Sequence, residues 1–312
     1  AVKRQTTTIK VAGLNGQGKY TAKYLDDTAG NEEKTVESDE KGEAVVNRNT
    51  EVTLTFLPAD ETNQNAEYSE NETFSILSEL KDEAQTDLFT GIKNSFDWTT
   101  KSYTYQLEAN KTVGKETYNL TAGFTKSNIL RVHVSAGSAT LPDDIPAEHK
   151  QTQGTTYRMI VPDNETKKFT FTEQVAQDPT NPSVVVAQAT WGTPAKPTEQ
   201  SVELGDEASQ YEYTTPEITE PRYLNVSFVK GQTVRVETEQ GSVVEGDQTW
   251  VDENGKKVIT VVQGKKLSVN VKPDDGLSLK SIELDATPLD VNAAKADGRL
   301  TKNGDGSYTY LF

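Results

Sequence analysis

Apolar and polar residues alternate along three segments of the chain, and each segment ends in a proline-containing turn. In the clearest one, Leu267, Val269 and Val271 alternate with polar residues, and Pro-Asp-Asp-Gly follows at 273–276. A period of two residues is typical of a half-buried β-strand, and Pro, Asp and Gly favour a turn. The alternation therefore predicts three related β units. The other two segments contain Val52, Leu54 and Phe56 before Pro58, and Tyr157, Met159 and Val161 before Pro162.

Further strands accompany each segment at similar distances. The three prolines lie roughly one hundred residues apart, which is a usual length for one β-sandwich. We therefore predict an all-β chain of three tandem Ig-like antiparallel β-sandwich domains, at 1–125, 126–228 and 229–312, joined end to end as a semi-rigid rod. An opening strand precedes each segment, at 8–11, 130–134 and 234–236, and a Tyr-x-Tyr strand follows, at 103–105, 211–213 and 308–310.

One region departs from the alternation. Between residues 66 and 97 apolar residues recur every three or four positions, as in an amphipathic helix, whereas the corresponding part of the third unit, from Leu277, has the pattern of a strand. Two alternatives stay open, a short helix inserted in the first unit and a further strand. The residues with helical spacing are Leu77, Leu80, Ala84, Leu88, Ile92 and Phe96.

Charge and cysteine content narrow the function classes. The chain has 48 acidic and 32 basic residues, a formal charge of −16, and no cysteine. Such a charge disfavours nucleic acid and anionic membranes as partners. Without cysteine there is no disulfide, thiolate metal ligand or thiol nucleophile. The chain starts at Ala1 and contains no run of eighteen apolar residues, so we expect a removed leader or an excised part of a longer protein, and no membrane span.

The third unit carries a further set of short motifs. Its opening strand begins at Val234, the turn Lys-Pro-Asp-Asp-Gly lies at 272–276, and Gly-Asp-Gly-Ser-Tyr-Thr-Tyr lies at 304–310. In these pieces the chain resembles the tandem Ig-like repeats of large secreted and wall-attached bacterial proteins, and similar domains also decorate phage tails and capsids. The resemblance covers the third unit well and the other two loosely. It implies a stalk or adhesin segment on a cell surface that is not an enzyme.

Candidate catalytic motifs are weak. Residues 13–19 have the glycine and lysine spacing of a phosphate-binding loop, but Tyr20 stands where Mg²⁺ needs a Ser or Thr, and a strand follows in place of a helix. We predict a hairpin turn there. The two histidines are His133, in a strand, and His149, in a polar loop. A catalytic triad or a zinc site needs several suitable side chains brought together, and these two residues do not indicate such a group.

Surface β-domains of this type sometimes carry an isopeptide bond between a buried Lys and a buried Asn. In this chain Lys10, Asn119 and Asn225 each alternate with inward apolar residues. They should therefore face water, which argues against such a bond.

Two kinds of binding site are predicted from residue type. Tryptophans near strand ends can stack on sugar rings, although tryptophans of small sandwiches also close the core. Acidic turns supply the oxygen ligands that Ca²⁺ prefers, although solvated turns are the alternative, and no other cofactor is expected. The candidates are Trp98, Trp191 and Trp250 for glycans, and Asp274, Asp275, Asn303 and Asp305 for calcium.

The third unit lacks a counterpart of the last strands of the first two, at 118–124 and 223–228. An incomplete sandwich leaves an open edge, which either receives a strand from a neighbouring molecule or is completed in a longer array.

We interpret the chain as a non-catalytic extracellular surface protein, a stalk or adhesin segment. Its expected partners are other domains of a longer surface protein, neighbouring subunits that add a strand, and host glycans or proteins. The alternatives are a carbohydrate-binding module and a phage tail or capsid decoration protein for host attachment.

Overall fold

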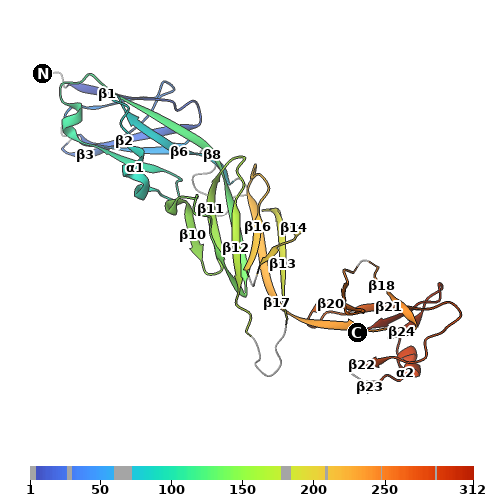
Figure 1. The fold of residues 1–312 in the computed structure, drawn as a ribbon. Helices are drawn as coiled ribbons and strands as arrows, with labels where there is room; N and C mark the ends of the chain where they lie inside the picture. The colour runs from blue at the N-terminus through green and yellow to red at the C-terminus, as the bar shows by residue number, and fades with distance from the viewer. Residues whose placement is uncertain are drawn as a thin grey trace. The chain divides into compact units, whose positions relative to one another are not determined.

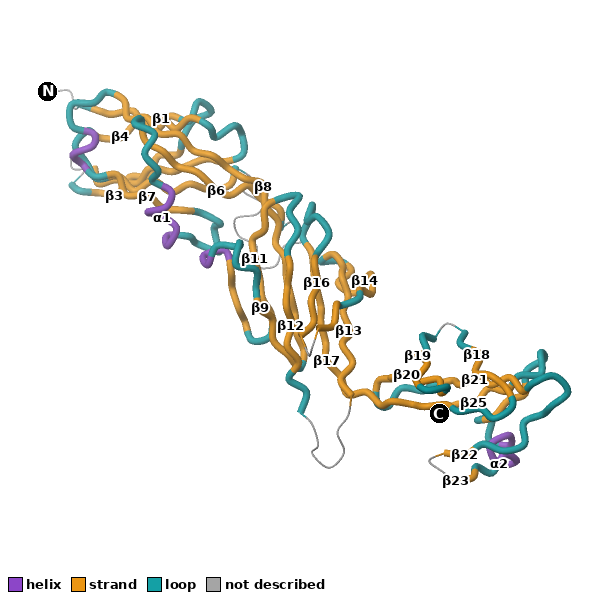
Figure 2. Tube along the Cα trace, in the orientation of Figure 1, coloured by secondary structure: helices purple, strands orange, loops and turns teal. Residues whose placement is uncertain are grey.

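The computed structural model describes residues 5–26, 30–59, 72–176, 184–207, 210–246, 248–284 and 287–312 (Figure 1). Strands dominate these residues and the helices are short, as Figure 2 shows, so the all-β prediction is confirmed. The chain forms two compact units. Unit 1 comprises Ala1–Thr172 with Ala189–Val226, and unit 2 comprises Glu173–Gln188 with Ser227–Phe312. The division into three domains stays a prediction.

Unit 1 begins with a first pair of sheets. One sheet has the order β3-β2-β5-β7, and the other contains β4, β1, the first half of β8, and β6. β1 is antiparallel to β4 and parallel to β8. The strands are β1 (Thr6–Ala12), β2 (Gly18–Asp26), β3 (Glu32–Glu37), β4 (Glu43–Asn47), β5 (Val52–Pro58), β6 (Thr73–Asp82), β7 (Tyr103–Leu107) and β8 (Thr117–Ser135).

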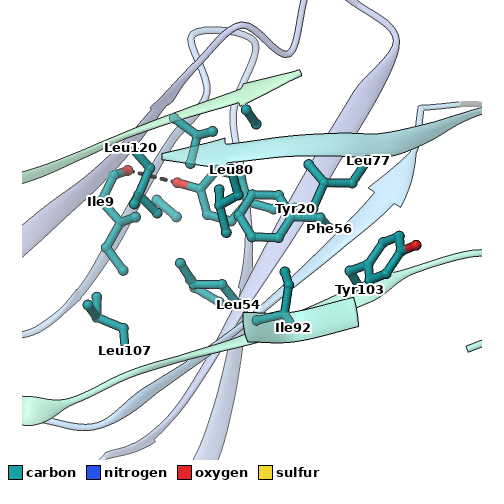
Figure 3. Close-up of a cluster of buried hydrophobic side chains, with 14 of the residues drawn as sticks. Ile9, Tyr20, Leu54, Phe56, Leu77, Leu80, Ile92, Tyr103, Leu107 and Leu120 are labelled. Atoms are coloured by element: carbon teal, nitrogen blue, oxygen red, sulfur yellow. Dashed lines mark hydrogen bonds between the residues drawn. The ribbon is translucent and has the colours of Figure 1, made fainter. Parts of the chain in front are cut away.

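The core of this pair follows the predicted alternation. In β5, Val52, Leu54 and Phe56 are fully buried, whereas the residues between them are partly exposed. Tyr20 of β2 lies beside Phe56, and its hydroxyl donates a 2.7 Å hydrogen bond to the carbonyl oxygen of Ile9 in the facing sheet (Figure 3). The one polar group of this buried ring is therefore paired within the core.

A second pair of sheets follows in the chain. One sheet has the order β10-β11-β8-β17-β13-β14, and the other has the order β15-β16-β12-β9. Trp191 of β13 contacts Tyr213 of β16, with the ring centroids 6.1 Å apart, so side chains of the two sheets meet. The strands are β9 (Gly137–Thr140), β10 (Lys150–Gln153), β11 (Thr156–Pro162), β12 (Lys168–Glu173), β13 (Val184–Thr193), β14 (Lys196–Val202), β15 (Gly205–Glu207), β16 (Gln210–Thr214) and β17 (Arg222–Val236).

Unit 2 contains a four-stranded sheet, β18-β21-β25-β24, and the ladder β19-β20-β17, in which residues 231–236 of β17 take part. Its strands are β18 (Gly241–Val244), β19 (Val251–Glu253), β20 (Lys256–Val262), β21 (Ser268–Pro273), β22 (Glu283–Leu284), β23 (Thr287–Pro288), β24 (Leu300–Lys302) and β25 (Tyr308–Leu311). Among the described residues, the helical segments are α1 (Phe89–Ile92), η3 (Lys93–Ser95), η4 (Ala109–Thr112), η5 (Ala147–His149) and α2 (Val291–Ala296).

The three alternating segments do not occupy equivalent places. β5 and β21 each pair with a Tyr-x-Tyr strand, β7 and β25 respectively. β11 instead pairs with β8, as β4 pairs with β1, and the Tyr-x-Tyr strand β16 pairs with β12 and β15. The predicted equivalence of 156–162 with the other two segments is therefore wrong. Alternation followed by a proline indicates a strand and a turn, and both occur on either sheet of a sandwich.

The helical spacing from Leu77 has a different cause. Residues 73–82 form strand β6, and its register with β8 shifts between Leu77 and Glu79. This β-bulge places Leu77 and Leu80, three residues apart, in the core. A helix forms only at 89–92, with a 3₁₀ turn at 93–95, while residues 66–71 lie outside the described residues.

The predicted hairpin at residues 13–18 is also wrong. The Gln17 amide donates to the carbonyl oxygen of Leu14 at 2.8 Å, so a turn is present. However, β1 pairs with β4 and β8, whereas β2 pairs with β3 and β5. The turn therefore crosses between facing sheets.

Both predicted domain boundaries fall inside continuous strands. Residues 125 and 126 lie in β8, and residues 228 and 229 lie in β17. Within unit 1 the first half of β8 pairs with β1 and β6, and the second half pairs with β11. The two pairs of sheets in unit 1 thus share one strand and have no linker at this point.

Candidate functional site

The three tryptophans lie in separate surroundings. Trp98 precedes β7 and is half-buried, and its indole Nε1 donates to the carbonyl oxygen of Glu148 at 2.9 Å. Trp191 and Trp250 are only 5% and 7% exposed, and Trp250 packs on Leu267 and Val269. Of the three rings, that of Trp98 is therefore the most accessible for stacking on a sugar.

In the acidic turn at 303–307, the polar side chains form hydrogen bonds with nearby residues of the same turn and strand. Asp305 Oδ1 accepts hydrogen bonds from the amide and hydroxyl of Ser307, and Asn303 Nδ2 donates to the Ser307 and Thr309 hydroxyls at 2.9 Å. Asp274 and Asp275 lie exposed in the turn after β21. Within the described ranges, no three or more His, Asp or Glu residues are grouped to hold a metal ion. Calcium binding at these four residues stays a prediction.

The other residues considered for catalysis or for an isopeptide bond lie apart from one another and do not form a shared site. His133 is exposed, and its Nδ1 lies 3.0 Å from the Thr156 hydroxyl. Lys10 and Asn119 are exposed as predicted, and each bonds an acid of its own, Glu43 and Glu83 respectively. Asn225 is half-buried and donates to the carbonyl oxygen of Pro197 at 2.9 Å.

A buried ionic cluster lies where the two pairs of sheets in unit 1 share β8. We call Glu72, Lys101, Arg131 and Arg158 the Glu72 cluster. Glu72 is 5% exposed and forms ion pairs with Arg131 of β8 and, at 3.3 Å, with Arg158 of β11. Arg158 also lies over the Trp98 ring, 5.6 Å from its centroid. The cluster therefore joins the start of β6, the loop before β7, and the second pair of sheets.

The Glu72 cluster contains more positive than negative side chains. It has three cationic side chains and one carboxylate, and Oε2 of Glu72 has no hydrogen-bond partner among the described residues. Burial raises the pKa of the Glu72 carboxyl, although Arg131 and Arg158 oppose this effect. Burial and the charge of Arg158 lower the pKa of Lys101. The attractions thus offset only part of the cost of removing these charges from water.

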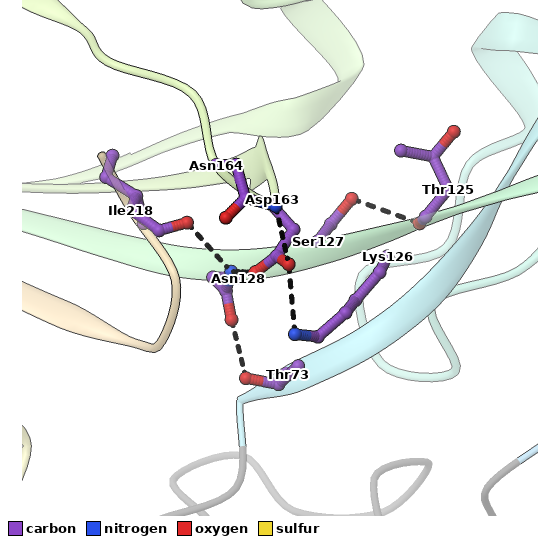
Figure 4. Close-up of polar contacts among 8 residues, drawn as sticks. All are labelled: Thr73, Thr125, Lys126, Ser127, Asn128, Asp163, Asn164 and Ile218. Atoms are coloured by element: carbon purple, nitrogen blue, oxygen red, sulfur yellow. Dashed lines mark hydrogen bonds and ion pairs between the residues drawn. The ribbon is translucent and has the colours of Figure 1, made fainter.

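A second polar contact lies at the midpoint of β8 (Figure 4). Asn128 is fully buried, and its Nδ2 donates to Asp163 Oδ1 at 2.8 Å and to the carbonyl oxygen of Ile218 at 3.2 Å. Its Oδ1 accepts a 2.6 Å bond from the Thr73 hydroxyl of β6. Hydrogen bonds from Asn128 and Lys126 lower the pKa of Asp163. One side chain therefore links both pairs of sheets.

His149 is part of this junction as well. Its Nε2 forms a 2.6 Å hydrogen bond with the hydroxyl of Tyr103 in β7, and its ring lies 5.2 Å from that of Phe96. Burial lowers the pKa of His149 to about 4. At neutral pH the ring is therefore uncharged, and its surroundings are those of a packed side chain.

Sequence reasoning missed the Glu72 cluster because its members carry no common motif. Arg131 lies between the inward Leu130 and Val132, and this position faces water in an ordinary sandwich strand. It is buried here because β8 passes between two pairs of sheets. The signal available was the long stretch 117–135, which is rich in strand-forming residues and has no proline at the supposed boundary.

None of the helices in the described ranges is long and apolar enough to cross a membrane.

Comparisons with known proteins returned distant structures alone. No family model and no curated protein matches the chain. A solved structure of GBS52, the minor pilin of Streptococcus agalactiae, is similar at 9% identity and a TM-score of 0.21, covering 75% of this chain and 100% of that one. A streptococcal ancillary pilin is similar at 9% identity and a TM-score of 0.17, covering 92% and 94%. Both neighbours are bacterial surface proteins, and similarity this low carries no argument about function.

Proposed function

We propose that this chain is a non-catalytic structural segment of an extracellular surface protein, a stalk or adhesin segment that holds its shape under load. The same role would serve on a cell or on a phage particle. The proposal assigns it other domains of a longer protein, or neighbouring surface subunits, as partners. The observation that carries the proposal is the parallel pairing of β1 with β8.

We call the parallel β1–β8 ladder the clamp, because its strand pairing should resist a force that pulls the ends of the chain apart. Five register pairs run from Thr8 opposite Thr117 to Ala12 opposite Thr121. When the ends of the chain are pulled apart, β1 is drawn toward its start and β8 toward its end. In a parallel ladder the hydrogen bonds are evenly spaced along the strands, so this load acts on all of them together in shear. Separation must then break the whole ladder at once.

Single-molecule pulling of the full chain tests the clamp. Lys10 is an exposed residue of β1, and Lys10→Pro removes its backbone N–H and disturbs the ladder while leaving the apolar core unchanged. We expect the unfolding force of the first pair of sheets to fall by about half or more, because the shear-loaded ladder is interrupted.

The matched control is Thr35→Pro in β3, which pairs with β2 at the edge of its sheet and lies outside the clamp. Its unfolding force should stay close to that of the wild type. Equal forces for Lys10→Pro and the wild type would refute the clamp.

Carbohydrate binding is the second candidate function, and the half-exposed Trp98 is the observation that favours it. A screen of the chain against glycans and host surfaces, with and without Ca²⁺, tests both predicted ligands. If a sugar stacks on Trp98, Trp98→Ala should lower binding at least about tenfold. Trp191→Phe, which changes a buried ring, should retain binding. Loss in both variants or in neither would argue against a site at Trp98.

A further inference from the structure

We propose that unit 2 is the part of this chain that yields first under load. It opens from the connection at residues 263–267, where two antiparallel ladders unzip while the clamp stays closed. Unit 2 thereby lengthens the chain at a low force and protects unit 1 from sudden loads. This inference rests on the proposed load-bearing function and describes how the chain responds to force.

In unit 1 the load passes directly between the strands that begin and end each pair of sheets. β1 pairs with the first half of β8 in the clamp, and the second half of β8 belongs to a sheet in which β17 is its hydrogen-bonded neighbour. The first and last strands of both pairs are thus joined by backbone hydrogen bonds. A pull on the chain is carried from β1 through β8 to β17 by strand pairing.

In unit 2 the last strand is separated from the first. Tyr308, Thr309 and Tyr310 of β25 each have a partner on both edges, from β21 on one side and from β24 on the other. Because both edges are filled by these strands, β17 cannot pair with β25. The load must therefore pass from β17 to its partner β20, through the connection 263–267 to β21, and from β21 to its partner β25.

The registers of the two ladders place the load at one end of each. In the β17–β20 ladder Gly231 lies opposite Val262, and in the β21–β25 ladder Ser268 lies opposite Leu311. The load enters β17 at its start and β25 at its end, and both of these ends adjoin the connection. An antiparallel pair that is pulled apart from one end loses its hydrogen bonds one after another.

Single hydrogen bonds are the first to carry the load at this connection. The Gln263 amide donates to the carbonyl oxygen of Lys230 at 2.8 Å, and the Phe312 amide donates to the carbonyl oxygen of Leu267 at 2.8 Å. Each of these bonds can break by itself, whereas the clamp must lose five register pairs together. Unit 2 therefore opens at a lower force than the clamp.

The apolar core of unit 2 adds less resistance than that of the first pair of sheets. Val52 and Leu54 of β5 are both 0% exposed. In unit 2, Leu267 and Val269 are buried, but Val234 of β17, which packs on them, is only partly buried. Hydrophobic stabilisation grows with the apolar area removed from water, so these layers separate at a smaller cost.

Single-molecule pulling of the full chain with an engineered cross-link identifies the part that opens first. Asn270 and Thr309 are register partners in β21 and β25, and directly opposite residues of an antiparallel pair lie close enough for a disulfide. The chain has no cysteine of its own, so Asn270→Cys with Thr309→Cys forms a single disulfide. In the oxidised variant the residues between these two positions cannot extend, and the first unfolding step should shorten by about 130 Å. A reductant should restore the full step, which also shows that the variant folds.

The control cross-link is Thr53→Cys with Gln106→Cys, between register partners of β5 and β7 in the first pair of sheets. It should shorten a later step and leave the first unchanged. The proposal is overturned if the oxidised 270–309 cross-link leaves the first step at its full length, or if the control cross-link shortens the first step. Lys10→Pro tests the clamp by its unfolding force, and the cross-links test the order of opening by step length, so the two failures are distinguishable.

Discussion

Replacing Glu72 with alanine should destabilise unit 1 by about 3–5 kcal/mol, because it leaves three buried or half-buried cations without their carboxylate. Lys101 and Arg131 are both less than 10% exposed, so water cannot take over the role of Glu72. Glu72→Gln keeps the side-chain volume and isolates the loss of charge, and it should be destabilising in the same direction. Denaturant unfolding at pH 7 measures both variants.

Glu83→Ala provides the comparison for an exposed acid. Glu83 bonds Asn119 and Lys115 at the surface, and its loss should cost less than about 1 kcal/mol. Replacing Glu72 and Arg131 together with leucine should cost less than Glu72→Ala alone, since no charge of that pair remains buried. If Glu72→Ala is no more destabilising than Glu83→Ala, the cluster does not stabilise the junction.

Replacing His149 with glutamine should make unit 1 less sensitive to acid between pH 6.5 and 4. The pKa of His149 is lowered to about 4 in the folded chain, against an ordinary value of 6.5. A base with a lowered folded pKa is neutral in both states above pH 6.5, and the unfolded state takes up the proton first as the pH falls. Stability from this group is therefore present above pH 6.5 and is lost toward pH 4, by about 3 kcal/mol at most.

Unfolding free energies at pH 7 and pH 4.5 measure this effect. Glutamine can still bond the Tyr103 hydroxyl, so His149→Gln should cost about 1 kcal/mol at pH 7 and lose less stability than the wild type on acidification. His133→Gln, at an exposed site, should retain the acid response of the wild type. Asp163 and Glu83 have lowered pKa values and act at lower pH, while the raised pKa of Glu72 acts in the opposite direction. Identical pH profiles for His149→Gln and the wild type would contradict the assignment.

The strands were predictable because one face of each sheet is buried and the other is solvated. Val52, Leu54 and Phe56 in β5 and the Tyr-x-Tyr pairs in β7, β16 and β25 lie in strands as expected. The alternation of apolar and polar residues indicates that one face of the sheet is buried, and this signal is strong in antiparallel sandwiches.

Pairing was not predictable by the same means. The alternation in 156–162 indicates a strand without indicating that its neighbour is β8 and not β16. The β-bulge in β6 changed the spacing of Leu77 and Leu80 to that of a helix. Long-range contacts decide both cases, and neither leaves a local sequence pattern.

The candidate sites show the same limit. Trp191 and Trp250 were attractive because tryptophans near strand ends can stack on ligands, yet their environment depends on the facing sheet. The Glu72 cluster gathers residues from four separate segments, and charged residue types are mostly exposed in proteins, so their identity gives no sign of burial. Only the passage of β8 between two cores places them together.

The sharing of β8 also restricts how the length of this chain can change. The inward side chains of its first half, Tyr118, Leu120 and Ala122, and those of its second half, Leu130, Val132 and Val134, all have even numbers. One residue inserted near position 125 would turn one of these sets away from its core, whereas two inserted residues would restore the facing of both. A loop between domains tolerates insertions of any length. At this junction we expect that only variants whose strand is longer or shorter by an even number of residues will fold. The permitted change in length is therefore a multiple of two residues.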